Sequence, residues 1–232
     1  MKIAVMQPYI FPYIGYFQLI SAVDTFVIFD DVNYINRGWI NRNNLLADGK
    51  KHLFTLKLSR SSQNTLIKDT YILGGKDNRE KILKMIAYSY SRAPFFNDII
   101  GLLKKILLND CPQLDEYLLF GLSEISRYLG IKTSFITSSS LKKSSGLEKS
   151  DKIIEIVKIM KADTYINPIG GTMLYNKAYF RKRGVDLFFL ESKEIVYPQF
   201  KNQFVPNLSI IDTLMFNSKN QTKRMLRYYS LT

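Results

Sequence analysis

The first thirty residues contain two apolar runs separated by one amphipathic segment. Residues 2–6 and 25–29 are short, apolar and rich in β-branched or aromatic side chains, which is typical of buried strands. Between them, apolar side chains recur at spacings of three and four residues and predict a helix over residues 15–23. Such a strand–helix–strand unit predicts two parallel strands of one sheet with the helix packed on its face.

The patterning changes from strand-like to helical in the middle of the chain. Residues 33–44 are polar and predict a loop or a short helix, while residues 52–58 and 66–73 have the patterning of two strands. Three successive segments then show helical spacing, with breaks at Pro94 and Pro112; they span residues 78–92, 95–109 and 113–129. We expect a helical insertion over residues 77–130 within one domain that spans residues 1–232, because both flanking regions have the patterning of one sheet.

Strand and helix patterns alternate again after the insertion. The predicted strands span residues 133–137, 164–167 and 185–190, and the predicted helices span residues 151–160, 174–183 and 210–216. The sequence therefore predicts an α/β fold, a doubly wound and mostly parallel sheet with a helical insertion in the middle of the chain.

The chain is strongly basic, because 33 Lys and Arg residues against 20 Asp and Glu residues give a formal charge of +13. This excess attracts phosphates, nucleotides, acidic carrier proteins, RNA or anionic membranes without choosing among them, and a solvated basic surface is the simplest explanation. There is no RNP, KH or zinc-finger spacing to support nucleic-acid binding.

Composition also limits the compartment and the reactive groups. No stretch approaches the roughly 18 apolar residues of a membrane span, and the first residues become polar too early for a secretory signal, so a cytoplasmic protein is expected. The single cysteine, Cys111, excludes an intrachain disulfide and is expected to be inert packing. The single histidine, His52, lies away from the other motifs and is expected to have no catalytic role.

Residues 7–16 form a stiff aromatic turn after the first predicted strand. Two prolines, of which Pro8 is the first, restrict the backbone, and Gly15 allows the chain to enter its helix closely. The spacing resembles the HxGH phosphate loop of nucleotidyltransferases, with Tyr13 and Tyr16 where the histidines would stand. Without histidine, the charge stabilisation of a leaving phosphate is missing, although helix amides could still bind a phosphate or carboxylate. A purely structural turn with an aromatic cap is the alternative.

Asp30 and Asp31 follow the second predicted strand and are the best acid–base candidates. A carboxylate that is partly desolvated beside another one would have a raised pKa and could accept a proton from an amine. Side-chain alternation along the strand predicts that one of the two faces the site. The alternatives are an N-cap with a salt bridge to Arg37 or Arg42, or a Mg²⁺ site beside bound phosphates, although no other metal motif is evident.

A cluster of planar polar groups surrounds the only tryptophan. Its candidate binding residues are Asn36, Arg37, Trp39, Asn41, Arg42 and Asn43. Arginine binds phosphates or carboxylates bidentately, and Trp39 could stack on a base or a sugar. Ordinary packing of Trp39 is the alternative.

A second strand-to-helix turn with two glycines and free amides follows the strand predicted at residues 164–167. Its candidate ligand-facing residues are Asn167, Gly170, Gly171 and Tyr175. Further on, Ser209 is a predicted N-cap, and Asp212 lies in the first turn of its helix, where carboxylates favour the helix dipole. We expect this last feature to be structural.

Taken together, these motifs resemble the WbqC-like family of bacterial polysaccharide-cluster proteins. The matching residues are Gln7, Pro8, Phe11, Pro12, Gly15 and Tyr16, then Asp24, Asp30, Asp31, Val32, Trp39, Asn41, Arg42 and Asn43, and finally Tyr197, Gln199, Leu208, Ser209, Ile210, Ile211 and Asp212. They occur in order along nearly the whole chain. Ser218 stands where the family commonly has glycine.

The resemblance implies a role in making O-antigen or capsule sugars, as an N-acyl or aminoacyl transferase of the glycine type. The acceptor would be the amino group of a nucleotide-linked amino sugar, and the activated acyl group would come from a carrier protein, coenzyme A or a tRNA. No tightly bound cofactor is expected. In this role, Arg37 and Arg42 would hold the diphosphate, Trp39 would stack on the base or sugar, Asp30 or Asp31 would take the proton, and Gln7 and Asn41 would orient the substrates.

Two other functions fit the same residues. A non-catalytic module that binds a nucleotide or an acidic carrier protein would use the basic and aromatic groups without chemistry. A nucleotidyltransferase-like enzyme would release pyrophosphate from ATP, and the missing histidines argue against it.

Overall fold

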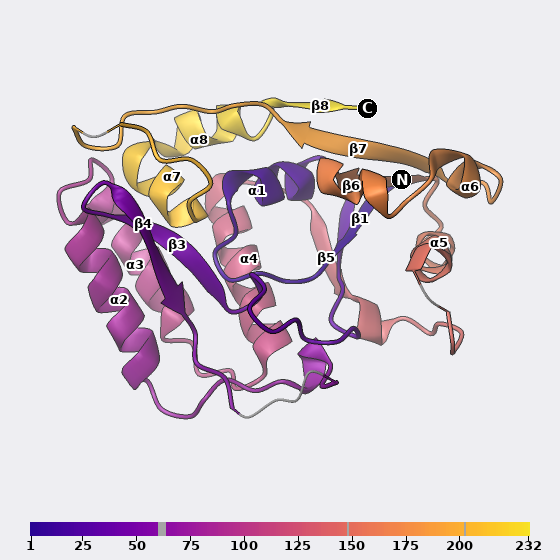
Figure 1. The fold of residues 1–232 in the computed structure, drawn as a ribbon, viewed down its shortest axis with the longest axis horizontal. Coiled ribbons are helices and arrows are strands. Elements are labelled where there is room, and N and C mark those ends of the chain that lie inside the picture. The colour runs from indigo at the N-terminus through magenta and orange to yellow at the C-terminus, as the bar shows by residue number, and fades with distance from the viewer. Residues whose placement is uncertain (60–63, 148, 202) are drawn as a thin grey trace.

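The computed structural model of the chain describes residues 1–59, 64–147, 149–201 and 203–232. In this part of the chain, one sheet has six strands in the order β5-β2-β1-β6-β7-β8, shown in Figure 1. The strands are β1 (Lys2–Met6), β2 (Thr25–Ile28), β5 (Ser134–Thr137), β6 (Thr164–Pro168), β7 (Asp186–Ser192) and β8 (Tyr229–Leu231). All neighbouring pairs are parallel except β7 and β8, which confirms the predicted α/β fold.

Helices cover both faces of this sheet. Helices α1 (Ile14–Ser21) and α7 (Ile210–Phe216) lie on one face. Helices α5 (Lys149–Ile159) and α6 (Lys177–Arg181) lie on the other. Successive residues of β1 point to opposite faces, so Ala4 belongs to the core under α1 and Val5 to the core under α5. The sheet is therefore doubly wound, as the sequence predicts.

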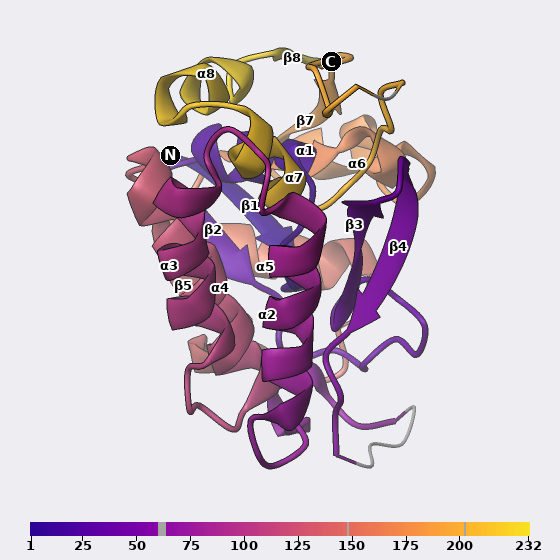
Figure 2. The ribbon, with the colours of Figure 1, turned by 90° about the vertical axis from the view of Figure 1, so that its left-hand side faces the viewer.

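Three helices form the insertion between the two halves of the sheet. They are α2 (Asp77–Tyr90), α3 (Phe96–Leu107) and α4 (Leu114–Leu129), at the positions that helical spacing predicts. Figure 2 shows α2 and α3 side by side, and Figure 1 places them at the end of the molecule opposite α6. Buried side chains of all three helices belong to the same hydrophobic cluster as those of α1 and α7, so the insertion and the sheet share one core.

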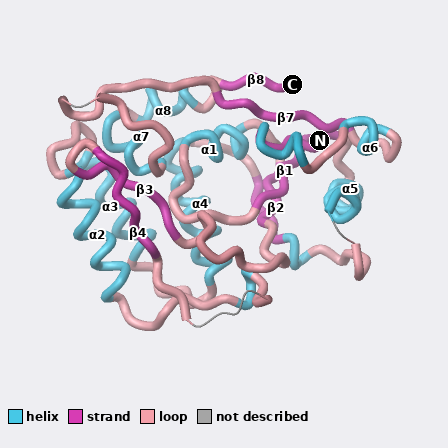
Figure 3. Tube along the Cα trace, in the orientation of Figure 1, coloured by secondary structure: helices cyan, strands magenta, loops and turns pink. Residues whose placement is uncertain are grey.

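A separate two-stranded ribbon corrects the prediction for residues 33–58. Strand β3 (Arg42–Ala47) begins within residues 33–44, which were expected to be loop or helix. It pairs antiparallel with β4 (Lys50–Thr55), which overlaps the strand predicted over residues 52–58, and the ribbon does not join the main sheet (Figure 3). The turn between them consists of Asp48 and Gly49, both with positive φ. An Asp-Gly pair with this backbone closes a tight hairpin, so residues 42–55 can pair locally without the sheet.

Two further elements differ from the sequence prediction. Residues 66–73 form the short 3₁₀ turn η1 (Ile67–Asp69) and isolated bridges, where a strand was expected. The helix predicted over residues 174–183 is reduced to α6, because the 3₁₀ turn η3 (Ile169–Met173) precedes it and the Asn176 side chain caps it by accepting from the Tyr179 amide.

The C-terminal end contains two elements that the sequence did not predict, α8 (Lys219–Met225) and β8. Ser218, which stands where the family commonly has glycine, is the N-cap of α8 and forms a capping box with Gln221. None of the described helices has both the length and the apolar character needed to cross a bilayer.

Candidate functional site

The segment after β1 lies where an α/β sheet is expected to bind its ligand. The chain runs from β1 to β2 on one side, and β6 pairs with β1 on the other side. Because the strand order changes direction there, a crevice is expected beside the carboxyl end of β1. Four predicted site residues lie at this edge. Gln7 follows β1, Asp30 and Asp31 come shortly after β2, and Asn167 lies in β6.

Asp30 is an internal anchor for two neighbouring turns. The residue is 0% exposed, and its carboxylate accepts hydrogen bonds from the Ser139 amide at 2.9 Å and from the Ser139 hydroxyl. Its carbonyl oxygen accepts from the Lys68 amide at 3.0 Å. A carboxylate enclosed in this way does not reach a substrate ammonium. The sequence suggested a partly desolvated base at this position, whereas Asp30 is fully enclosed.

Asp31 lies in a salt bridge with two lysines. Its Oδ2 is 3.1 Å from Lys143 Nζ and 3.4 Å from Lys152 Nζ, whereas the expected ion pair with Arg37 or Arg42 is not formed. Burial raises the pKa of the Asp31 carboxyl. Hydrogen bonding from Ser138 and Lys143 and the charges of Lys143 and Lys152 outweigh this effect and lower the pKa below its ordinary value. A carboxylate that is stabilised as an anion is a weak proton acceptor.

Arg42 braces the loop that carries Trp39. Its Nε donates to the Gly38 carbonyl at 2.9 Å, its Nη2 donates to the Arg37 carbonyl, and its guanidinium lies 5.7 Å from the centre of the Trp39 ring. Arg42 is therefore engaged within the protein. By contrast, Trp39 is 48% exposed, and Asn36 and Arg37 are exposed beside it.

Buried amides fix the turn after β1 against the ribbon and α7. Asn43 Nδ2 donates to the carbonyls of Ile10 at 3.1 Å and Phe11 at 2.8 Å, and the Ser209 hydroxyl donates to the same Phe11 carbonyl at 2.8 Å. Phe11 has a φ of 43°, an uncommon conformation for a bulky residue, which these three bonds hold in place. Asn41 is also buried; its Oδ1 accepts from the Tyr34 hydroxyl, and its Nδ2 donates to the carbonyl of Leu56, just after β4.

The same turn presents one aromatic ring to the surface and buries another. The Tyr16 hydroxyl donates to the Gln7 carbonyl at 2.8 Å, and both Tyr16 and Pro8 are buried. Tyr13 is 41% exposed. Its ring lies against Gly15, where an added Cβ would be 2.4 Å from Tyr13 Cε2. Any larger residue at position 15 would therefore displace the Tyr13 ring from this position.

Aromatic side chains enclose a cavity of about 190 Å³ beside this turn. It is lined by Tyr9, Pro12, Tyr13, Trp39, Asn43 and Asn207. Three of these residues, Tyr13, Trp39 and Asn43, were predicted to bind a ligand, and the structure brings them together. Half-exposed aromatic walls of this kind can stack on a planar ring.

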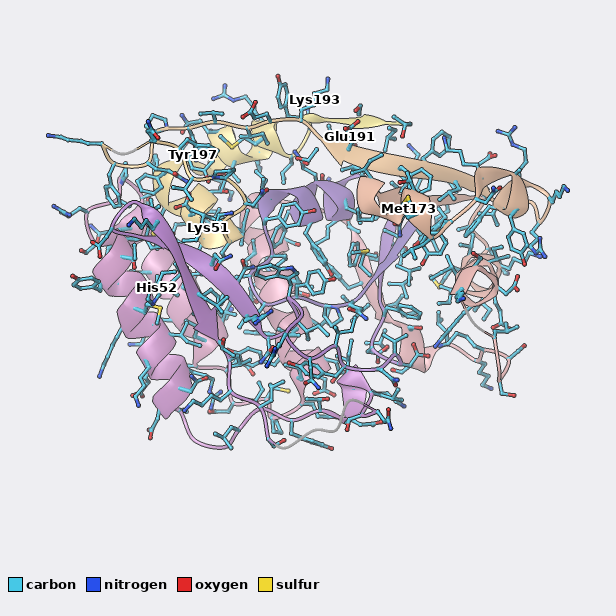
Figure 4. All side chains as sticks on the ribbon, viewed as in Figure 1. Lys51, His52, Met173, Glu191, Lys193 and Tyr197 are labelled. Atoms are coloured by element: carbon cyan, nitrogen blue, oxygen red, sulfur yellow. The ribbon has the colours of Figure 1, made fainter. Side chains whose placement is uncertain are left out.

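A second cavity of about 290 Å³ adjoins the first one, since both are lined by Tyr13 and Asn207. Its wall contributes polar groups, among which are Lys193, Tyr197 and Thr213. In Figure 4, Lys193 lies just beyond β7 and Tyr197 lies close to α7. We call the two adjoining cavities the Tyr13 groove. It has an aromatic compartment at Trp39 and a polar compartment at Tyr197.

A buried carboxylate lies directly behind the polar compartment. Asp212 Oδ1 accepts hydrogen bonds from the Tyr197 hydroxyl at 2.8 Å and from Gln199 Nε2 at 2.7 Å, and its Oδ2 accepts from the Tyr90 hydroxyl at 3.0 Å. The Tyr197 hydroxyl also lies 3.1 Å from Thr213 Oγ1. Tyr197 therefore connects the groove to Asp212.

The surroundings of Asp212 give it the protonation behaviour expected of a base. Burial raises the pKa of Asp212 to about 6, although the hydrogen bonds from Tyr197, Gln199 and Tyr90 lower it in part. A pKa close to the working pH is what general-base catalysis requires. Sequence reasoning interpreted Asp212 only as a helix-dipole residue, and the available signal was its place in the ordered family motif with Tyr197 and Gln199.

Comparison with known proteins identifies the family. The sequence model of the WbqC-like protein family matches residues 7–224, from the turn after β1 into α8. The chain belongs to the WbqC-like protein family. The resemblance stated from the motifs is therefore confirmed. A relative, "Uncharacterized protein Rv1507c" of Mycobacterium tuberculosis, is 27% identical over 233 residues, which are 98% of each chain. There is no match among solved structures.

Side-chain contacts hold the turn after β6 of this WbqC-like protein, which was predicted to offer free amides to a ligand. Asn167 Nδ2 donates to the Tyr165 hydroxyl at 2.6 Å, and the Tyr175 ring packs edge-on against Tyr165. A Cβ on Gly171 would lie 1.9 Å from Asn167 Oδ1, whereas one on Gly170 would meet nothing within 4 Å. These predicted residues lie together, but they do not line the Tyr13 groove.

His52 and Cys111 lie outside the groove. His52 is exposed on β4, opposite Leu45 in the ribbon (Figure 4). The Cys111 thiol donates to Glu116 at 3.3 Å, and burial, followed by this contact, raises the pKa of the thiol. Among the described residues of this WbqC-like protein, no group of three or more His, Cys, Asp or Glu side chains could hold a metal ion.

Proposed function

We propose that the protein is an N-acyl or aminoacyl transferase whose acceptor is the amino group of a nucleotide-linked amino sugar. One observation carries the proposal: the aromatic compartment of the Tyr13 groove continues into a polar compartment backed by Asp212. An acceptor of this class needs both parts, a surface that stacks on a planar base and a group that takes a proton from an amine. Membership of the WbqC-like family supports the same class of reaction.

The proposed acceptor lies along the groove with its nucleoside at Trp39 and its sugar at Tyr197. The base stacks on the exposed rings of Tyr13 and Trp39. The diphosphate then reaches Lys193, which lines the polar compartment, and Arg37 is a second exposed cation beside Trp39. This arrangement differs from the one suggested by the sequence, since Arg42 is engaged by its own loop.

The proposed chemical step uses Tyr197 and Asp212 as a proton relay. The amine nitrogen forms a bond to the acyl carbon, and the bond from that carbon to the carrier oxygen or sulfur breaks. The amine proton passes to the Tyr197 hydroxyl while the hydroxyl proton passes to Asp212. Asp212 returns the proton through Tyr197 to the leaving group. Asp31 is not assigned this role, because its two lysines hold it as a stable anion.

The alternative is a binding module that holds the same nucleotide-linked ligand without transferring a group. It is favoured by the burial of Asp212, which is 0% exposed and reaches the groove only through Tyr197. In both cases we expect a cytoplasmic protein, where nucleotide-linked sugars and acyl carriers are present together. The formal charge of +13 suits docking of an acidic carrier.

Mass spectrometry tests the proposal and separates the two functions. Nucleotide-linked amino sugars are incubated with the protein and with glycine or other acyl groups activated on a carrier protein, coenzyme A or tRNA. A mass gain on the sugar nucleotide that requires the protein supports the transferase. Saturable binding of the sugar nucleotide, with no mass gain from any donor, would contradict the transferase and support the binding module.

A further inference from the structure

A second surface, separate from the Tyr13 groove, exposes apolar side chains in and beside η3. Ile169 is 40% exposed, Leu174 is 72% exposed and Met173 is 91% exposed. Figure 4 marks Met173 at this position, below β7. Single exposed apolar residues are ordinary, but three within six positions of the sequence concentrate apolar side chains at η3, and exposed apolar surface of this kind is typical of regions that bind a partner.

A run of cations follows these apolar side chains. Residues 169–183 contain Lys177, Arg181, Lys182 and Arg183 and no acidic residue. Arg183 lies 3.5 Å from Asp151, which neutralises it in part. Within the described part of the chain, the ion pairs involve neither Arg181 nor Lys182, and both side chains are exposed.

One apolar and one cationic residue of this region, Leu174 and Lys182, line a common hollow. This open cavity of about 680 Å³ is also lined by Lys149, Ser150, Asn176, Tyr179 and by Asp151, whose carboxylate is paired with Arg183. The helices that carry these residues, α5 and α6, lie together at one end of the molecule (Figure 1). The cavity does not share a lining residue with the Tyr13 groove, so it is a separate site.

We propose that this surface docks the protein on an anionic membrane surface. We call it the η3–α6 face and define it by Ile169, Met173, Leu174, Arg181 and Lys182. Proteins bind a bilayer surface without crossing it through two contributions. Apolar side chains insert shallowly between the lipid headgroups, and cationic side chains are attracted to anionic headgroups. A protein partner would also cover apolar side chains, but the absence of acidic residues over residues 169–183 favours a uniformly anionic partner.

Vesicle sedimentation of the full chain tests the proposal directly. We expect binding to vesicles that contain phosphatidylglycerol, much weaker binding to vesicles of phosphatidylcholine alone, and weakening by added salt. The double variant Arg181→Gln, Lys182→Gln should bind the anionic vesicles about 25-fold more weakly, because each charge removed weakens binding about fivefold. The variant Met173→Ser with Leu174→Ser should bind about tenfold more weakly.

Helix α2 supplies matched controls at the other end of the molecule. Lys81 and Lys84 are exposed there, and Tyr88 is 80% exposed. Lys81→Gln with Lys84→Gln makes the same change of charge, and Tyr88→Ser removes a comparable apolar side chain. Both controls should bind vesicles within twofold of the unchanged protein. Equal losses for the controls, or no preference of the unchanged protein for anionic vesicles, would overturn the proposal, whatever the result of the acyl-transfer assay.

Discussion

Asp212 and Asp31 are both surrounded by hydrogen-bond donors, yet their pKa values move in opposite directions. Neutral donors surround Asp212, so burial is the largest effect and raises its pKa to about 6. Two ammonium groups lie beside Asp31, so its pKa is lowered although burial acts against this. The charge of the donors therefore decides which carboxylate can accept a proton at neutral pH.

The Tyr197 hydroxyl should be needed for turnover, while the Tyr90 hydroxyl should not. Both donate one hydrogen bond to Asp212, but Tyr197 also lines the groove. We expect Tyr197→Phe to lower kcat by about 10²–10⁴-fold, which is the range for loss of general-base catalysis. Tyr90→Phe is the matched control and should keep kcat within about tenfold. Steady-state kinetics of acyl transfer measures both, and equal losses would contradict the relay.

Asp212 should also make stability depend on pH in an unusual direction. Its pKa is about 6 in the folded protein, above the ordinary 3.8, so the folded state holds more protons between these two pH values. The free energy of unfolding should therefore fall as pH rises through this window, by about 3 kcal/mol from this group. Chemical denaturation of the unchanged protein and of Asp212→Asn measures the effect. The difference between their curves should vary with pH in this sense, and a constant difference would contradict the raised pKa.

The exposed face of Trp39 should contribute to binding and little to folding. The side chain is 48% exposed and lines the aromatic compartment. Trp39→Ala should weaken binding of the nucleotide-linked sugar by about tenfold to a hundredfold, since stacking of one base contributes about 1–3 kcal/mol. Calorimetric titration measures the change. Tyr88→Ala, at an exposed aromatic position on α2, should leave the affinity unchanged, and an equal loss there would show that the effect is not specific to the groove.

At the scale of elements, the two glycines of the turn after β6 have different surroundings. A Cβ on Gly171 would lie 1.9 Å from the Asn167 side chain, which is buried, whereas one on Gly170 would meet open space. We expect Gly171→Ala to lower the free energy of unfolding by about 1–3 kcal/mol through this overlap. Gly170→Ala should change it by less than about 0.5 kcal/mol. Thermal unfolding measures both, and equal effects would contradict the packing described for η3.

Elements that depend on local spacing were predictable, and elements that depend on tertiary contacts were not. The three helices of the insertion follow from apolar residues at spacings of three and four, and β1 and β2 follow from short apolar runs. The β3–β4 ribbon also had a local signal, the Asp48–Gly49 turn, which sequence reasoning overlooked. By contrast, η1 is fixed by contacts of its backbone with Asp30 and Val32, so its strand-like composition was misleading.

At the scale of the whole molecule, the sheet and the family were predictable, whereas the environment of each carboxylate was not. Asp30 and Asp31 are neighbours in sequence at the expected edge, but their partners Ser139 and Lys152 lie more than a hundred residues away. Tyr90 is similarly far from Asp212. Tyr13, Trp39 and Asn43 were predicted as binding residues and do line one cavity, because the turn after β1 meets the start of β3 and the loop that precedes it.

The proposed acyl transfer requires Asp212 to accept the amine proton. The most direct test is the rate of acyl transfer to a nucleotide-linked amino sugar as a function of pH, for the unchanged protein, Asp212→Asn and Asp31→Asn. The unchanged protein should gain rate as pH rises through about 6, as Asp212 loses its proton. Asp212→Asn should be slower by about 10²–10⁴-fold and lack this rise, while Asp31→Asn should keep it. A normal rate for Asp212→Asn, or the large loss in Asp31→Asn instead, would contradict the account.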